Sequence, residues 1–188
     1  MELKGERRLP VDRDTAWRAL NDPEVLRACI PGCESLEKTG DGAYAVGVAV
    51  ALGPVRARFK GTLRLEDVVP PASYTLRFEG QGGTAGFAKG SSEVRLAEDG
   101  AAATLLGYTA NAQVGGRLAQ VGSRLIDASA LKLADDFFAA FERQVAGTIA
   151  PSAPAPGPEP STRASVARRI AYIGIVVAVV VLGIVLLR

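Results

Sequence analysis

Residues 55–66 alternate strictly between apolar and polar side chains, and this alternation constrains the fold more than any other feature of the chain. One set would share a face of an extended segment: Val55, Ala57, Phe59, Gly61, Leu63 and Leu65. The other set is polar: Arg56, Arg58, Lys60, Thr62, Arg64 and Glu66. Successive side chains of a strand point to opposite faces. The pattern therefore predicts an antiparallel sheet that covers a core on one side and meets water on the other.

The same two-residue period recurs in other segments. Besides 55–66, strands are expected at 3–10, 44–52, 74–80 and 106–114. A glycine-rich stretch, with glycines at 80, 82, 83, 86 and 90, interrupts the pattern. Its G-x-G-x-x-A spacing does not stand between a strand and a helix, so we reject a dinucleotide site. The stretch indicates a flexible hairpin with bulges, with a gating loop as the alternative.

Helical signals stand at both ends of these strands. Short helices are expected at 13–21, with Asp12 as N-cap, and from Pro23 to a residue before Pro31. From 118 to 146 the apolar residues are spaced as on one helix face and proline is absent, which predicts one long helix. We therefore expect an α+β domain over residues 1–147, with an antiparallel sheet and a long C-terminal helix.

Two further segments follow this domain. Residues 148–167 form a proline-rich stretch, which predicts a flexible and extended linker. Residues 170–187 are uncharged and mostly apolar, and a helix of that length just spans a hydrocarbon core of about 30 Å. We predict a C-terminal transmembrane anchor at 168–188. Arg168 and Arg169 precede the apolar run, so the positive-inside rule places the domain on the cytoplasmic side of the cell membrane.

Histidine is absent from the sequence, which excludes several kinds of site. A Ser-His-Asp or Cys-His catalytic site cannot be built without it. Structural zinc usually needs four Cys or His ligands, and the chain has only two cysteines. We accordingly identify no catalytic residue and no metal site, and predict that the chain is not an enzyme. Residues 1–147 hold 18 Lys/Arg and 19 Asp/Glu, so no basic excess suggests nucleic acid.

The two cysteines lie close together in the stretch RACIPGCESL at 27–36. Cys29 and Cys33 allow a metal clamp, a redox pair or two small core residues at a turn. We expect reduced, mostly buried residues rather than a redox pair. The Pro31-Gly32 pair between them suits a type II turn.

A row of cations on the polar face of 55–66 leaves a second choice open. Arg56, Arg58, Lys60 and Arg64 could dock an acidic partner or lipid headgroups. Such a row is more often a solvated sheet face, which is the interpretation we favour.

Several short motifs follow one another along the domain. They are Trp17 with LNDP at 20–23, CIPGC at 29–33, GPV at 53–55, FKG at 59–61, GGRLAQVG at 115–122 and RLI at 124–126. In this order they resemble the CoxG family of carbon monoxide dehydrogenase subunits, which has the helix-grip fold of the START/polyketide-cyclase superfamily. The proline-rich stretch and the apolar tail are also similar to membrane-anchored members.

The resemblance implies a cavity between the sheet and the long helix. It implies an accessory protein of a molybdenum-containing CO dehydrogenase or a related hydroxylase, at the inner face of the membrane. The cavity would bind a hydrophobic small molecule, such as a quinone that accepts electrons from the partner. Candidate cavity residues are Trp17, Phe59, Phe78, Tyr108, Leu118, Gly122, Leu125 and Ser129, with Tyr108 and Ser129 as polar contacts. The alternatives are a lipid-transfer domain and a cyclase- or dehydratase-like enzyme of the same fold.

Overall fold

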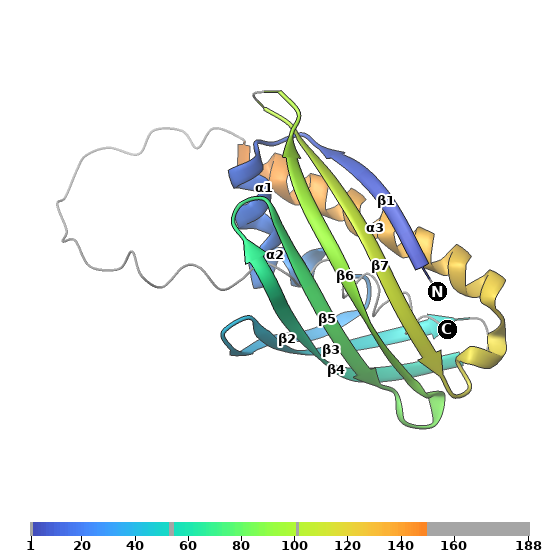
Figure 1. The fold of residues 1–188 in the computed structure, drawn as a ribbon. Coiled ribbons are helices and arrows are strands. Elements are labelled where there is room, and N and C mark those ends of the chain that lie inside the picture. The colour runs from blue at the N-terminus through green and yellow to red at the C-terminus, as the bar shows by residue number, and fades with distance from the viewer. Residues whose placement is uncertain (1, 53–54, 101, 150–188) are drawn as a thin grey trace.

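The computed structural model describes residues 2–52, 55–100 and 102–149, and these form seven strands and three α-helices (Figure 1). The strands are β1 (Glu2–Leu9), β2 (Cys33–Gly40), β3 (Ala43–Leu52), β4 (Val55–Val69), β5 (Ser73–Gln81), β6 (Phe87–Glu98) and β7 (Thr104–Gly115). The helices are α1 (Arg13–Leu20), α2 (Pro23–Cys29) and α3 (Ser123–Ile149), with short 3-10 turns η1 (Gly83–Ala85) and η2 (Ala119–Val121).

All seven strands belong to one antiparallel sheet in the order β1-β7-β6-β5-β4-β3-β2. Helix α3 crosses one face of this sheet, and α1 and α2 lie beside the end of α3 that carries its C-terminus (Figure 1). We call the sheet face that buries its side chains toward the helices the inner face, and the opposite one the outer face. This arrangement confirms the predicted helix-grip α+β fold for the described domain.

The alternation that predicted β4 is reproduced in the burial of its side chains. Phe59 and Leu63 are buried on the inner face, whereas Arg56, Arg58 and Lys60 are exposed on the outer face. On β3, the inner-face residues Tyr44, Val46, Val48 and Val50 are all buried. The period of two therefore identified the correct buried face of both strands.

The caps of the short helices also follow the sequence. Asp12 Oδ1 accepts a hydrogen bond from Thr15 N at 2.9 Å at the start of α1. Asp22 caps α2, whose first residue is Pro23. Helix α2 ends at Cys29, before Pro31, and Gly32 has a φ of +73°, which the turn into β2 requires.

The long helix starts later than the sequence predicted. Residues 119–121 form the 3-10 turn η2, and Gly122 has a φ of +95°, outside the range of an α-helix. Helix α3 therefore begins at Ser123 rather than at residue 118, and it continues to Ile149. Its buried side carries Ile126, Ala130, Leu133, Ala134, Phe137, Phe138, Phe141 and Val145.

The predicted linker at 148–167 lies outside the described residues beyond the end of α3, and so does the whole predicted anchor at 168–188. Within 2–52, 55–100 and 102–149, no helix combines the length and the apolar character needed to cross a bilayer.

Candidate functional site

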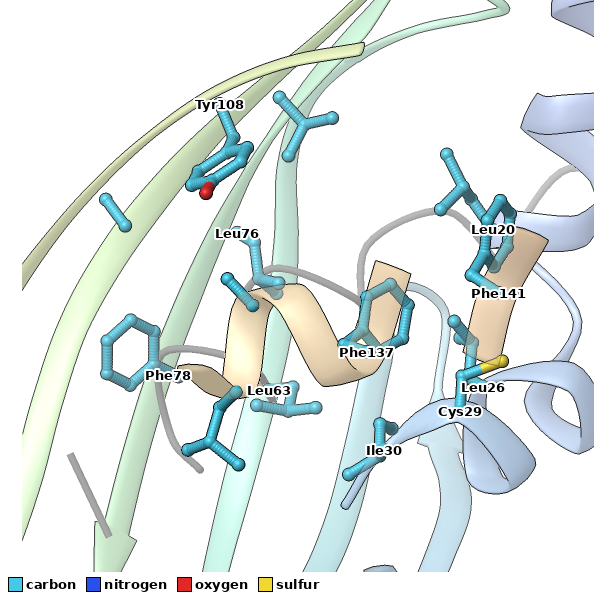
Figure 2. Packing of buried hydrophobic residues seen from close by; sticks show 14 of the residues in the cluster. Leu20, Leu26, Cys29, Ile30, Leu63, Leu76, Phe78, Tyr108, Phe137 and Phe141 are labelled. Carbon is cyan, nitrogen blue, oxygen red and sulfur yellow. The ribbon is translucent and has the colours of Figure 1, made fainter. Parts of the chain in front are cut away.

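The space between the sheet and the C-terminal half of α3 is filled by aromatic side chains, and we call this the aromatic end. Phe137 stacks on Phe141 with 5.9 Å between ring centroids, and Tyr108 of β7 stacks on Phe138 at 5.7 Å. Figure 2 shows Phe137 and Phe141 close to Leu26, Cys29 and Ile30 of α2. Trp17 of α1 meets Tyr74 of β5 edge-on at 6.1 Å. Bulky rings from four elements thus occupy this end.

The edge strand β1 is fixed to α3 at this end by Arg7. Its guanidinium forms an ion pair with Asp135 and lies 5.6 Å from the centre of the Phe138 ring. A cation over an aromatic face is stabilising. Arg7 therefore joins the edge of the sheet to the helix.

At the other end of the interior, the inner face of the sheet carries very small side chains. The strand registers place Gly61 opposite Gly80, Gly80 opposite Ala88 and Ala88 opposite Val114. We call Gly61, Gly80 and Ala88 the small-residue row. Ala88 is fully buried and Gly80 is buried. Three neighbouring strands thus present almost no side-chain volume toward the interior here.

Two loops close over the same end of the sheet. In the loop between β5 and β6, Ala85 O accepts a hydrogen bond from Leu118 N of the loop between β7 and α3, at 3.0 Å. A Cβ added to Gly116 would lie 2.5 Å from the Cα of Gly86, so the two backbones are in direct contact. Leu118 is fully buried and belongs to the same apolar cluster as Ala85 and Ala88. We call these two segments, 82–86 and 116–122, the paired loops.

A hollow of about 570 Å³ opens beside the paired loops, between the end of β7 and the first turn of α3. Its apolar lining includes Ala112 and Val114 from the inner face of β7 and Ile126 from the buried side of α3. The polar side chains at this hollow are Gln113, Ser123 and Asp127. The hollow therefore reaches from solvent to residues of the sheet–helix interior.

The eight candidate cavity residues do not lie together. Phe78 precedes Gly80 on the inner face of β5, and Phe59 lies so near Gly82 that a Cβ there would overlap its ring. Leu118 is the buried residue of the paired loops, so these three are near the small-residue row. Trp17 and Tyr108 are at the aromatic end. The residues opposite them in the sheet, including Val94, are about 20 Å along β6 from Ala88, at about 3.3 Å per residue.

The other three candidates are not oriented as expected. The side chain of Leu125 is 42% exposed, because α3 buries the stripe that begins at Ile126. Gly122 is exposed, and no atom lies within 4 Å of a Cβ built there. Ser129 is half-buried, and its hydroxyl donates to Leu125 O at 2.8 Å. The sequence analysis assigned Leu125 to the wrong face because it assumed a helix from residue 118.

The structure adds two alanines to the candidate site. Ala88 completes the small-residue row, and Ala112 lines the hollow. Both stand on the apolar phase of alternating strands, and only the strand register shows which glycines lie beside them.

Four ionisable groups of the interior are held in their neutral forms. Burial raises the pKa of the Cys29 thiol to about 11 and raises that of Cys33 as well. Burial also raises the pKa of Tyr74, and that of Tyr108 despite the opposing charge of Arg7. None of the four is poised to exchange a proton near pH 7. They suit the binding of an uncharged molecule.

The cysteines match the expectation in part. Both are free thiols; Cys29 is buried, while Cys33 is half-buried at the start of β2. In the part of the chain that the structure describes, no three His, Cys, Asp or Glu side chains gather where they could hold a metal ion.

Comparison with solved structures shows that this fold is widespread. A conserved protein from Geobacillus kaustophilus is 30% identical, with a TM-score of 0.75, over 79% of this chain and 97% of that one. Zhui aromatase/cyclase from Streptomyces sp. R1128 is 14% identical, with a TM-score of 0.61, over 79% of this chain and 95% of that one. A START superfamily protein from Mycobacterium smegmatis is 12% identical, with a TM-score of 0.61, over 78% and 98%. The last two comparisons show the shared fold alone.

Family comparison covers almost the whole described domain. No curated protein matches the chain. Residues 5–146, however, match the CoxG family of carbon monoxide dehydrogenase subunits from β1 to the C-terminal part of α3. Since this match extends over most of the sequence, the chain belongs to the CoxG family of carbon monoxide dehydrogenase subunits.

Proposed function

We propose that this chain is a non-catalytic accessory protein of a molybdenum-containing CO dehydrogenase or related hydroxylase, and that it binds an apolar molecule between the sheet and α3. Membership of the CoxG family supports the accessory role. The observation that carries the ligand proposal is the small-residue row, Gly61, Gly80 and Ala88, beneath the paired loops. The neutral interior groups are consistent with binding rather than acid–base chemistry.

The ligand would enter through the hollow beside the paired loops. Ala112, Val114 and Ile126 would contact its apolar part, and Leu118 would move aside as the loops separate. Each 100 Å² of apolar surface removed from water contributes about 2.5 kcal/mol, so a long hydrocarbon chain would dominate the affinity. An isoprenoid quinone has such a chain and could accept electrons from the partner enzyme. Tyr108 and Ser129 remain the predicted polar contacts for its headgroup.

The membrane location is part of the same proposal. The apolar run at 170–187 would anchor the chain in the cell membrane, with the domain on the cytoplasmic side. A tether would keep the domain near a bilayer, where isoprenoid molecules reside. Deletion of residues 164–188 should release a folded protein from the membrane fraction. A truncated protein that still sediments with membranes at high salt would contradict the anchor.

Native mass spectrometry of the full-length chain, purified from its own membrane, tests the ligand class. A co-purifying quinone would support the proposal. A phospholipid would favour the alternative of a lipid-transfer domain. The third possibility, a cyclase- or dehydratase-like enzyme, shares its fold with the aromatase/cyclase. It would be supported by turnover of a bound polyketide, and it would need Asp, Glu or Tyr as acid and base because the chain has no histidine.

A further inference from the structure

The outer face of the sheet holds a second hollow, of about 620 Å³, on the side away from the small-residue row. Its floor is formed by uncharged polar side chains of three strands, including Thr62, Ser91 and Asn111. Arg64, Arg77 and Lys89 stand around this floor, with Glu79 as the one acidic residue of the lining. The hollow therefore combines hydrogen-bonding groups with an excess of positive charge.

Arg64 and Arg77 are directly opposite each other on neighbouring strands. Like charges in this position are unfavourable unless an anion lies near them. Arg77 has its own partner, since its Nε lies 2.5 Å from Glu66 Oε2. Arg64 forms no ion pair with any described residue, and neither does Lys89. Two cations at the hollow thus lack a carboxylate.

The cationic surface continues along β4 from this hollow. Lys60 and Arg56 are exposed on the same face and form no ion pair with a described residue, whereas Arg58 pairs with Glu34 at 2.8 Å. Beside them, the outer face of β3 carries only small residues: Ala43, Ala45, Gly47, Ala49 and Ala51. A third hollow, of about 560 Å³, lies over Ala49, Ala51 and Arg56. Together they make a low track with cations along one side.

We propose that this outer track binds a carboxylate-rich segment of a partner protein, with Arg64 and Lys89 as the principal contacts. Arginine and carboxylate can form two parallel hydrogen bonds, which gives such a contact geometric specificity. A protein segment fits better than a lipid surface because the cations surround a recess with polar walls. None of the exposed large apolar side chains of the described residues lines that recess, so nothing there would insert into a bilayer.

The position of the track separates it from the proposed ligand site. The small-residue row is on the inner face, and the hollow that leads to it is beside α3. A partner on the outer face would leave that hollow open. Binding of an acidic segment and binding of an apolar molecule can therefore succeed or fail independently.

A charge-reversal experiment on the full-length chain in neutral detergent tests this proposal. The probe is a fluorescein-labelled peptide of alternating glutamate and serine, and fluorescence anisotropy measures its dissociation constant. Arg64→Glu and Lys89→Glu should each weaken binding by about tenfold, because each replaces an attraction with a repulsion. The matched control is Arg143→Glu, which changes the net charge equally at an exposed position of α3. It should alter the dissociation constant less than about twofold.

Ionic strength and a lipid probe complete the test. Binding should weaken steeply as ionic strength rises from about 0.01 M to about 0.15 M, which shortens the Debye length from about 30 Å to about 8 Å. Circular dichroism confirms that the variants fold. Equal losses in Arg64→Glu and Arg143→Glu would overturn the proposal. So would binding of vesicles of phosphatidylcholine and phosphatidylglycerol that depends on Arg64 when the peptide does not bind.

Discussion

The two ends of the space between the sheet and α3 are built from opposite kinds of side chain. At the aromatic end, Phe137, Phe138 and Phe141 pack against rings from α1, β5 and β7 or against apolar residues of α2 (Figure 2). At the other end, Gly61, Gly80 and Ala88 face the interior beneath two loops. We infer that the aromatic end supplies stability and that the small-residue end supplies room for a ligand.

The sharpest way to break this comparison is to empty the aromatic end. Phe137→Ala removes a fully buried ring, which should lower the free energy of unfolding by about 3–5 kcal/mol. The control is Leu125→Ala on the exposed side of the same helix, which should cost less than about 0.5 kcal/mol. Urea denaturation monitored by circular dichroism measures both. Similar values for the two variants would show that the rings do not carry the stability.

Emptying the other end should have a different signature. Leu118→Ala removes a fully buried side chain and should lower the free energy of unfolding by about 2–4 kcal/mol. An added isoprenoid quinone should restore more stability to this variant than to the unchanged chain, because the ligand can fill the space that Leu118 occupied. Urea denaturation with and without the quinone gives both quantities. A loss that no apolar ligand restores would make Leu118 an ordinary core residue.

A smaller effect is expected from the thiol at the aromatic end. Below about pH 9 Cys29 is protonated in the folded and unfolded chain, whereas its folded pKa is raised to about 11. As pH rises from 9 toward 11, the unfolded chain loses this proton first. The free energy of unfolding should therefore fall by about 2 kcal/mol over that interval, since one pKa unit corresponds to about 1.4 kcal/mol.

Cys29→Ala isolates this contribution from that of Tyr74, which titrates in the alkaline range as well. The variant should show a shallower loss of stability above pH 9 than the unchanged chain. Identical slopes in urea denaturation would mean that the Cys29 thiol is solvated in the folded state.

Local chemistry made much of the fold predictable. The alternation of β4 and the caps Asp12 and Asp22 act over a few residues, so the sequence displays them directly. The start of α3 was not predictable in this way, since apolar residues at 118, 121 and 125 mimic a helical stripe. Leu118 is buried because the β7–α3 loop folds back to Ala85, which is a contact between segments distant in sequence.

The candidate site was predictable only in part for the same reason. Phe59 and Phe78 were recognised as inner-face residues beside glycines, and both are buried there. The row that joins Gly61, Gly80 and Ala88 depends on the register of three strands, which no single segment encodes. Trp17 was grouped with them although it packs on Tyr74 at the opposite end.

Isothermal titration of the full-length chain with an isoprenoid quinone tests the division of the interior most directly. Ala112→Leu adds volume to the hollow beside the paired loops, whereas Ala140→Leu adds the same volume in the C-terminal half of α3. Both substitutions should cost about 1–3 kcal/mol of stability at most, and circular dichroism verifies folding. We predict that Ala112→Leu weakens quinone binding at least about tenfold, which is about 1.4 kcal/mol, and that Ala140→Leu leaves it unchanged. Undiminished binding by a folded Ala112→Leu variant, or equal losses in both variants, would contradict the account.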